Sequence, residues 1–196
     1  FGNEGFIFSA GADLGMIFMM SVEQEYDKLD IAIKYFQETM MKLRYSNIPT
    51  IASPHGLTLG GGCELCMHAD KVVAAAETYI GLVEFGVGLI PGGGGTKEMT
   101  LRTSESFKKN DVELNILRES FLNIAMAKVS ESAYQAFGLG IFQKEKDYVV
   151  VENKRLLSIA KQEIINIANR GYTKPIKKKE IKVLGKQSLG MFYVGS

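Results

Sequence analysis

Three glycine-rich turns in the first half of this 196-residue chain constrain its fold more than any other feature. The first contains Gly11 and follows the apolar residues 6–8, the second is the glycine triplet at residues 60–62, and the third is the run at residues 92–95. Glycine lets the backbone turn sharply and leaves its N–H groups unshielded by a side chain. The turns therefore predict places where the main chain itself can donate hydrogen bonds to a ligand.

The hydrophobic pattern predicts strands alternating with helices early in the chain and mainly helices later. The strands are expected at residues 6–10, 50–53, 71–76, 79–82 and 148–151. The helices are expected at residues 27–45, 63–69, 112–127, 130–137 and 153–169. A turn at residues 57–62 and loops at residues 83–95 and 174–186 connect or follow them. This order predicts an α/β fold.

Composition excludes several classes of function. The net charge of +1 gives no reason to expect a nucleic acid or a membrane surface as the main partner. The longest apolar run, at residues 16–20, is far shorter than the roughly 20 residues that span a bilayer. Two cysteines and the absence of a recognisable signal peptide favour a cytoplasmic location.

The two cysteines form a Cys-x-x-Cys pair, Cys63 and Cys66, which has two interpretations. A metal or redox site would need further ligands, and His68 supplies at most a third. The alternative is that two small side chains fill the buried face of a helix. The sequence favours this second interpretation, and no metal site is expected.

The glycine triplet opens a predicted helix, whose first N–H groups have no partner inside the helix. The helix dipole at this end favours negative charge, so the N–H of Gly61 is a natural donor to an oxyanion. Two such donors at one carbonyl form an oxyanion hole, and losing one donor costs ~3–4 kcal/mol of transition-state stabilisation. A thioester suits this arrangement, because polarising its carbonyl permits an enolate and activates a conjugated double bond.

Two carboxylates accompany this predicted donor. Glu64 lies about one helical turn after Gly61, and Glu84 lies in an apolar, glycine-rich loop where burial would raise its pKa and suit acid catalysis. Each feature has a plainer interpretation when taken alone. The triplet could bind a phosphate or permit close packing, Glu64 could lie on a helix surface, Glu84 could form a salt bridge, and residues 91–95 could be a flexible linker.

Taken together, the motifs resemble the enoyl-CoA hydratase/isomerase, or crotonase, family. The match rests on residues 8–14, on residues 49–69 with the triplet and Glu64, and on residues 82–84 with 88–96. Their order and spacing agree over residues 5–100. The resemblance implies an α/β, crotonase-like fold of (ββα)n spiral type followed by C-terminal helices. It also implies one domain, with the core and site in residues 1–110 and a helical region in residues 111–196.

The resemblance assigns a role to each candidate site residue. Ala12 and Gly61 would be the oxyanion donors, Glu64 would orient the attacking water, and Glu84 would pass a proton at the α carbon. The residues expected to bind substrate or coenzyme A are Ala10, Gly11, Asp13, Leu14, Met16 and Gly60. Residues 16–20 would border the acyl tail or form a core-facing turn. The tail lysines would meet the coenzyme A phosphates or form a solvated surface.

The implied activity is hydration of 2-enoyl-CoA in fatty-acid β-oxidation, because relatives with other chemistry commonly lack one of the two glutamates. An isomerase of the same fold and a silent acyl-CoA-binding part of a larger complex are the alternatives. The strands that normally begin the fold are expected to lie ahead of Phe1, which makes the chain a fragment. It looks most like the hydratase part of bacterial bifunctional 3-hydroxyacyl-CoA dehydrogenases, in which NAD would bind outside this chain. The resemblance implies no other cofactor and a homo-oligomer, a trimer or a pair of trimers, or membership of a β-oxidation complex.

Overall fold

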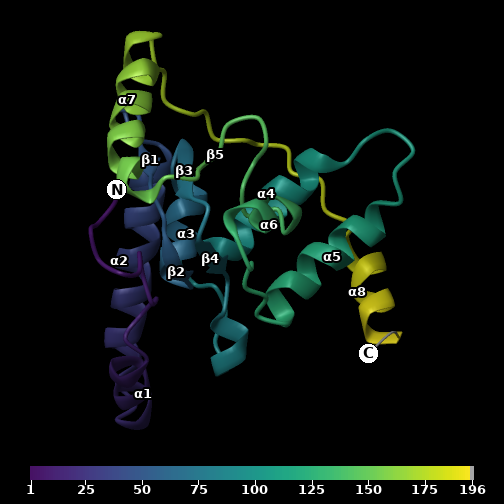
Figure 1. Ribbon diagram of the computed structural model, residues 1–196. Helices are drawn as coiled ribbons and strands as arrows, with labels where there is room; N and C mark the ends of the chain where they lie inside the picture. Colours follow the sequence, from purple (N-terminus) through teal and green to yellow (C-terminus); the bar gives the residue numbers. More distant parts are fainter. Residues whose placement is uncertain (195–196) are drawn as a thin grey trace.

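The computed structural model describes residues 1–194 and has short parallel strands surrounded by helices (Figure 1). The strands are β1 (Ile51–Ala52), β2 (Gly56–Leu59), β3 (Lys71–Ala75), β4 (Thr78–Gly81) and β5 (Tyr148–Val150). The earlier helices are α1 (Leu14–Val22), α2 (Tyr26–Arg44), α3 (Gly61–His68) and α4 (Gly95–Ser106), with the 3₁₀ turn η1 (Glu84–Val87). The later helices are α5 (Glu113–Ala125), α6 (Ala133–Gly138), α7 (Leu156–Asn169) and α8 (Gly185–Val194), with the 3₁₀ turn η2 (Asn153–Arg155).

The strands form two separate parallel sheets. One has the order β1-β3-β5, and the other pairs β2 with β4 from Gly56 beside Thr78 to Leu59 beside Gly81. Residue Ser9 adds a parallel bridge to Thr58 on β2. Parallel strands joined in this way bring the ends of several segments to the same edge of a sheet, where α/β proteins commonly bind ligands.

Side chains of β3 divide the core into two parts. Val72 and Ala74 face a cluster that includes Met67 of α3 and Ala136 of α6. Val73 and Ala75 face the opposite cluster, which includes Leu156 and Ala160 of α7. This alternation follows from the two-residue period of a strand. Leu156 and Ala160 on the apolar side of α7 therefore pack in the internal core.

Several predicted elements are confirmed and others are wrong. The helices at 27–45, 63–69, 112–127 and 153–169 and the strands at 50–53, 71–76, 79–82 and 148–151 are present within a few residues, and the helix at 130–137 begins at Ala133. The strand predicted at residues 6–10 is reduced to the bridge at Ser9. Residues 57–59 belong to β2 and not to a turn, and residues 16–20 lie in α1. Helices α4 and α8 had no predicted counterpart.

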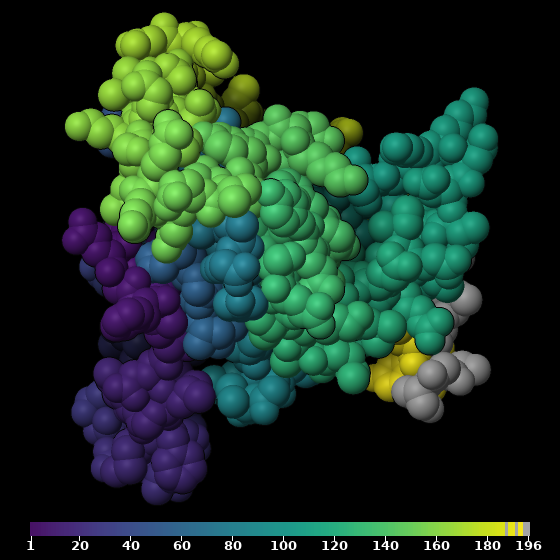
Figure 2. Space-filling model, in the orientation of Figure 1, coloured from purple at the N-terminus to yellow at the C-terminus, as the bar shows by residue number. Residues whose placement is uncertain are grey.

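Helices α1 and α2 contact each other and project from the body of the molecule (Figures 1 and 2, purple). Helix α1 buries none of its side chains, and Met16, Phe18 and Met19 are exposed, so the core-facing interpretation of residues 16–20 is wrong. Over the described residues, no helix has the length and apolar character needed to cross a bilayer.

Candidate active site

Three chain segments end at one edge of the β2-β4 sheet and form the frame of the candidate site. The Leu59 N–H donates to the Ser9 carbonyl at 2.9 Å, and the Gly60 N–H donates to the Gly81 carbonyl at 3.0 Å. The segment after Ser9 leads to Ala12, the segment after β2 leads to α3, and the segment after β4 leads to Glu84. Segments far apart in the sequence thus deliver the predicted site residues to the same edge.

The two predicted oxyanion donors come from adjacent backbones. A Cβ on Gly11 would lie 3.3 Å from the Leu59 carbonyl oxygen, so the Gly11 turn packs directly on the entry to α3. Gly60 has φ +52°, a left-handed conformation that glycine adopts without strain, and this turns the chain from β2 into α3. Across the described residues, neither the Ala12 N–H nor the Gly61 N–H donates to another protein group. Both remain available to an incoming acceptor.

The Glu64 side chain is buried, with only 2% of its surface exposed, so the surface-helix interpretation is wrong. Its Oε1 accepts a 2.7 Å hydrogen bond from the N–H of Gly95, the first residue of α4. Burial raises the pKa of the carboxyl group to about 7, the Gly95 N–H opposes that rise, and the charge of Glu84 adds to it. Near neutral pH, Glu64 can therefore hold or release a proton.

Glu84 opens η1 beside Gly60, since its Oε1 would lie 3.2 Å from a Cβ at that position. Partial burial raises the pKa of this carboxyl group above its ordinary value. Its Oε2 is inaccessible to solvent and has no hydrogen-bond partner among the described residues. No ion pair of the described residues includes Glu84, which contradicts the salt-bridge interpretation. A buried carboxylate oxygen without a partner is costly and is typical of a functional group.

The third glycine run packs against α2 and is not a flexible linker. A Cβ on Gly93 would lie 2.2 Å from the Phe36 ring and 2.5 Å from Glu64 Oε2, so only glycine fits between them. The Gln37 side chain donates to the Gly92 carbonyl at 2.8 Å. The Phe36 ring also lies against Gly61, because a Cβ there would be 3.1 Å from it. Helix α2 therefore holds both glycine turns that flank Glu64.

Sequence reasoning missed this function of α2 and of Gly95. The pattern of residues 27–45 predicts a helix but gives Phe36 no part in the site, and it does not indicate that the Gly95 N–H is the partner of Glu64. The glycine run itself was the available signal, because several glycines in succession often mark a close approach of backbone to another group. What the sequence could not supply was the distance across space, since Gly95 and Glu64 are 31 positions apart.

The residues predicted to bind substrate or coenzyme A fall into two groups. Gly60 is buried in the frame described above. The others are exposed along the start of α1: Ala10, Gly11, Asp13, Leu14 and Met16. The Asp13 carboxylate caps α1 by accepting from the Met16 N–H at 3.0 Å. Their contact with a ligand stays a prediction.

Cys63 and Cys66 are free thiols buried in the core cluster that contains Met67 and Ala136. Burial raises the pKa of both thiols well above the ordinary value, which keeps them protonated and unreactive. The interpretation of this pair as core packing is confirmed. Over residues 1–194, no group of His, Cys, Asp or Glu side chains is arranged to hold a metal ion.

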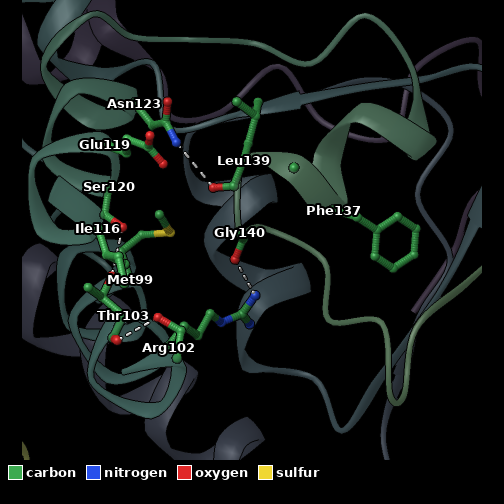
Figure 3. A pocket seen from close by; sticks show the side chains of 12 residues that line it. Met99, Arg102, Thr103, Ile116, Glu119, Ser120, Asn123, Phe137, Leu139 and Gly140 are labelled. Atoms are coloured by element: carbon green, nitrogen blue, oxygen red, sulfur yellow. Dashed lines mark hydrogen bonds between the residues drawn. The ribbon is translucent and has the colours of Figure 1, made fainter. Parts of the chain in front are cut away.

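A separate hollow of about 190 Å³ lies between α4, α5 and the end of α6 (Figure 3). Arg102 donates to the Gly140 carbonyl there, and Asn123 donates to the Leu139 carbonyl. Neither Glu64 nor Glu84 lines it. Hydrogen bonds between its lining residues join the helices to one another. The hollow is therefore a junction between helices and not part of the candidate site.

Comparisons with known proteins agree with this geometry. The family described as enoyl-CoA hydratase/isomerase matches residues 2–109. A probable 3-hydroxyacyl-CoA dehydrogenase of Bacillus subtilis is 43% identical over 195 residues, which are 100% of this chain and 24% of that protein. A putative fatty acid oxidation complex trifunctional enzyme of Rickettsia prowazekii is 34% identical over 85% of this chain and 23% of its own length.

Solved structures show the same architecture. An enoyl-CoA hydratase of Bacillus anthracis has a TM-score of 0.65 and 28% identity, covering 85% of this chain and 57% of its own. A putative enoyl-CoA hydratase of Thermobifida fusca, solved with acetoacetyl-CoA, has a TM-score of 0.65 and 22% identity, covering 86% of this chain and 62% of its own.

The fold, with one buried and one partly buried carboxyl group beside glycine turns, defines a protein of the crotonase fold. The chain belongs to the enoyl-CoA hydratase/isomerase family, whose profile matches more than half of it. It spans about a quarter of the length of the relatives from Bacillus subtilis and Rickettsia prowazekii.

Proposed function

We propose that this chain carries the hydratase site of an enzyme that adds water across the 2,3 double bond of a 2-enoyl-CoA. The observation that most supports this proposal is the pair Glu64 and Glu84 beside the same glycine turns. Burial, nearly complete for Glu64 and partial for Glu84, raises the pKa of both carboxyl groups. Hydration needs one group to handle the water and another to handle the proton at the α carbon. A Glu64 carboxyl group with a pKa of about 7 and a Glu84 carboxyl group with a raised pKa suit these two tasks.

The proposed chemistry follows from the positions of these groups. The N–H groups of Ala12 and Gly61 would polarise the thioester carbonyl and stabilise the negative charge that develops on its oxygen. Ionised Glu64, held by Gly95, would orient a water molecule and accept its proton as the oxygen adds to the β carbon. Protonated Glu84 would deliver a proton to the α carbon. The charge of Glu84 adds to the rise in the Glu64 pKa, so ionisation of Glu64 depends on the state of Glu84.

The proposal is tested by following the loss of conjugated thioester absorbance when crotonyl-CoA is hydrated. Glu64→Gln and Glu84→Gln should each lower kcat by roughly 10²–10⁴-fold, the contribution of a general acid or base. Glu38→Gln is the matched control, because Glu38 is exposed on α2 and should leave the rate unchanged.

Three outcomes would contradict the proposal. A wild-type protein that converts 3-enoyl to 2-enoyl thioesters without hydrating crotonyl-CoA would be an isomerase. A protein that binds acyl-CoA with no turnover in either assay would be a binding module. Full activity of both glutamate variants would show that the reaction occurs elsewhere in the protein.

We also infer a dehydrogenase activity for the protein as a whole, supported by the relative from Bacillus subtilis and its name. In that case the 3-hydroxyacyl product would be oxidised with NAD bound outside this chain. Reduction of NAD by the full-length protein supplied with crotonyl-CoA would support the coupling. Cell fractionation tests the proposed cytoplasmic location. Light scattering, which measures the molar mass in solution, tests the proposed trimeric assembly.

A further inference from the structure

A buried polar cluster lies directly behind Glu64 and is not used by the proposed chemistry. Its members are His68 on α3, Lys97, Glu98 and Arg102 on α4, and Arg44 on α2. His68 and Glu98 are each about 1% exposed. Placing so many polar groups in a core is expensive unless they are well paired, so the cluster calls for an explanation.

The hydrogen bonds of His68 define its state. Its Nδ1 lies 2.7 Å from the Glu64 carbonyl oxygen, and because a carbonyl only accepts, Nδ1 carries the hydrogen. Burial lowers the pKa of His68 to about 4, so the ring is neutral at pH 7 and its Nε2 is an acceptor. Lys97 Nζ lies 2.9 Å from that Nε2 and donates to it. The approach of His68 to Glu98 at 3.7 Å is therefore not an ion pair.

The ring of His68 also supports the third glycine turn. A Cβ on Gly94 would lie 3.0 Å from both Cε1 and Nε2 of the ring, so the Gly94 backbone packs directly on it. Gly94 precedes Gly95, whose N–H anchors the Glu64 carboxylate. His68 thus contacts the main chain of Glu64 on one side and the peptide before its anchor on the other.

The remaining members of the cluster hold His68 and Lys97 in place. Glu98 Oε1 lies 3.0 Å from Lys97 Nζ and 3.6 Å from Arg44 Nε, and these cations lower the pKa of Glu98 despite its burial. Arg102 ties α4 to α3 by donating to the Met67 carbonyl at 2.8 Å. The cluster therefore joins α2, α3 and α4 around one neutral imidazole.

We propose that His68 is a positioning residue for Glu64, which fixes the backbone on both sides of the contact between the Glu64 carboxylate and the Gly95 N–H. The catalytic part of this inference rests on the proposed hydratase function. The ring does not touch the substrate in this proposal. It acts by keeping the Glu64 carboxylate against the start of α4. There the carboxylate is shielded from water, and the Gly95 N–H fixes its orientation.

The test compares two substitutions that separate the contacts of His68. In His68→Asn, the amide nitrogen replaces Nδ1 and can still donate to the Glu64 carbonyl, whereas His68→Leu removes both polar contacts at similar volume. Selective ¹³C labelling of glutamate lets NMR follow the Glu64 titration directly, with Glu64→Gln identifying the signal. His68→Leu should lower the Glu64 pKa by about one unit, because entry of water removes the largest cause of its rise and outweighs a weaker Gly95 hydrogen bond, which opposes that rise. His68→Asn should largely restore the wild-type pKa.

Crotonyl-CoA hydration provides the second measurement. His68→Leu should lower kcat about tenfold with little change in KM, because the defect lies in the alignment of Glu64 and not in substrate binding. Lys97 contacts the ring from its more exposed side. Lys97→Met should therefore lower kcat and the Glu64 pKa by less than His68→Leu does.

The two readouts keep this inference separate from the proposed function. A Glu64 pKa that stays unchanged in folded His68→Leu and Lys97→Met overturns the positioning role, whatever the enzyme catalyses. If the pKa changes as expected but wild type hydrates no enoyl-CoA, the hydratase proposal fails and the structural role of His68 stands. If His68→Leu does not fold, the titration of Lys97→Met decides, because His68→Asn is expected to match wild type.

Discussion

At the scale of single residues, the site depends on carboxyl groups held by main-chain atoms. Glu64 receives its hydrogen bond from the backbone of Gly95, and Glu84 lies beside the backbone of Gly60. The sequence identified both glutamates and the glycines around them, because their types and spacing carry a chemical meaning. It gave Phe36 no part in the site and considered His68 only as a metal ligand, because the importance of both residues comes from the groups that they contact.

Gly93→Ala should reduce kcat by about ten- to a hundredfold, because its Cβ would displace the Phe36 ring and Glu64 Oε2, and small misplacements of reacting groups are costly. Gly92→Ala is the matched control, since its Cβ would meet nothing closer than 3.7 Å. Steady-state hydration kinetics of the two variants provide the comparison. Equal rates for both would mean that the close contact at residue 93 has no influence on the reaction.

At the scale of elements, the sequence predicted those with a regular apolar pattern and missed those held by other forces. Helix α4 has few apolar side chains and is fixed instead by Arg102, which donates to the carbonyls of Met67, Gly140 and Ile141. Such contacts link distant parts of the chain and leave no local period. The strand expected at residues 6–10 shows the converse case, in which an apolar local pattern does not form the element. Phe6 is fully exposed, and only residues 8 and 9 bond to the neighbouring strand.

Helix α1 could have been predicted from its cap, because Asp13 precedes it and bonds to the Met16 N–H. Asp13→Ala should remove about 1 kcal/mol of helix stability, whereas Asp13→Asn should retain the cap. Hydrogen exchange of the α1 amides measures this directly, with an expected increase of roughly fivefold for the alanine variant. If Asp13→Asn exchanges as fast as Asp13→Ala, the charge and not the cap stabilises the helix.

At the scale of the whole molecule, Glu64 and His68 give stability opposite dependences on pH. The Glu64 pKa is about 7 in the folded chain against an ordinary value of 4.5, so its contribution is present below 4.5 and is lost as pH rises to about 7. The His68 pKa is about 4 against 6.5, so its contribution is present above 6.5 and is lost as pH falls to about 4. The two effects partly cancel in the wild-type protein.

Comparing wild type with Glu64→Gln removes the shared contribution of His68. The stability of Glu64→Gln relative to wild type should increase between pH 4 and pH 8 by up to about 3 kcal/mol, because the variant avoids ionising a buried group. Chemical denaturation at several pH values measures the difference. A stability difference that does not change with pH would mean that the Glu64 pKa is ordinary in the folded protein.

The structural separation between frame and carboxyl groups also affects how this protein can evolve. The frame consists of main-chain atoms at glycine turns, where an added side chain would collide with neighbouring atoms. Substitutions of these glycines should therefore be selected against. The carboxyl groups belong to single side chains that project into the frame, and exchanging one leaves the turns intact. New reactions on related thioesters can therefore arise by one-codon changes at Glu64 or Glu84, without rebuilding the scaffold that receives the carbonyl.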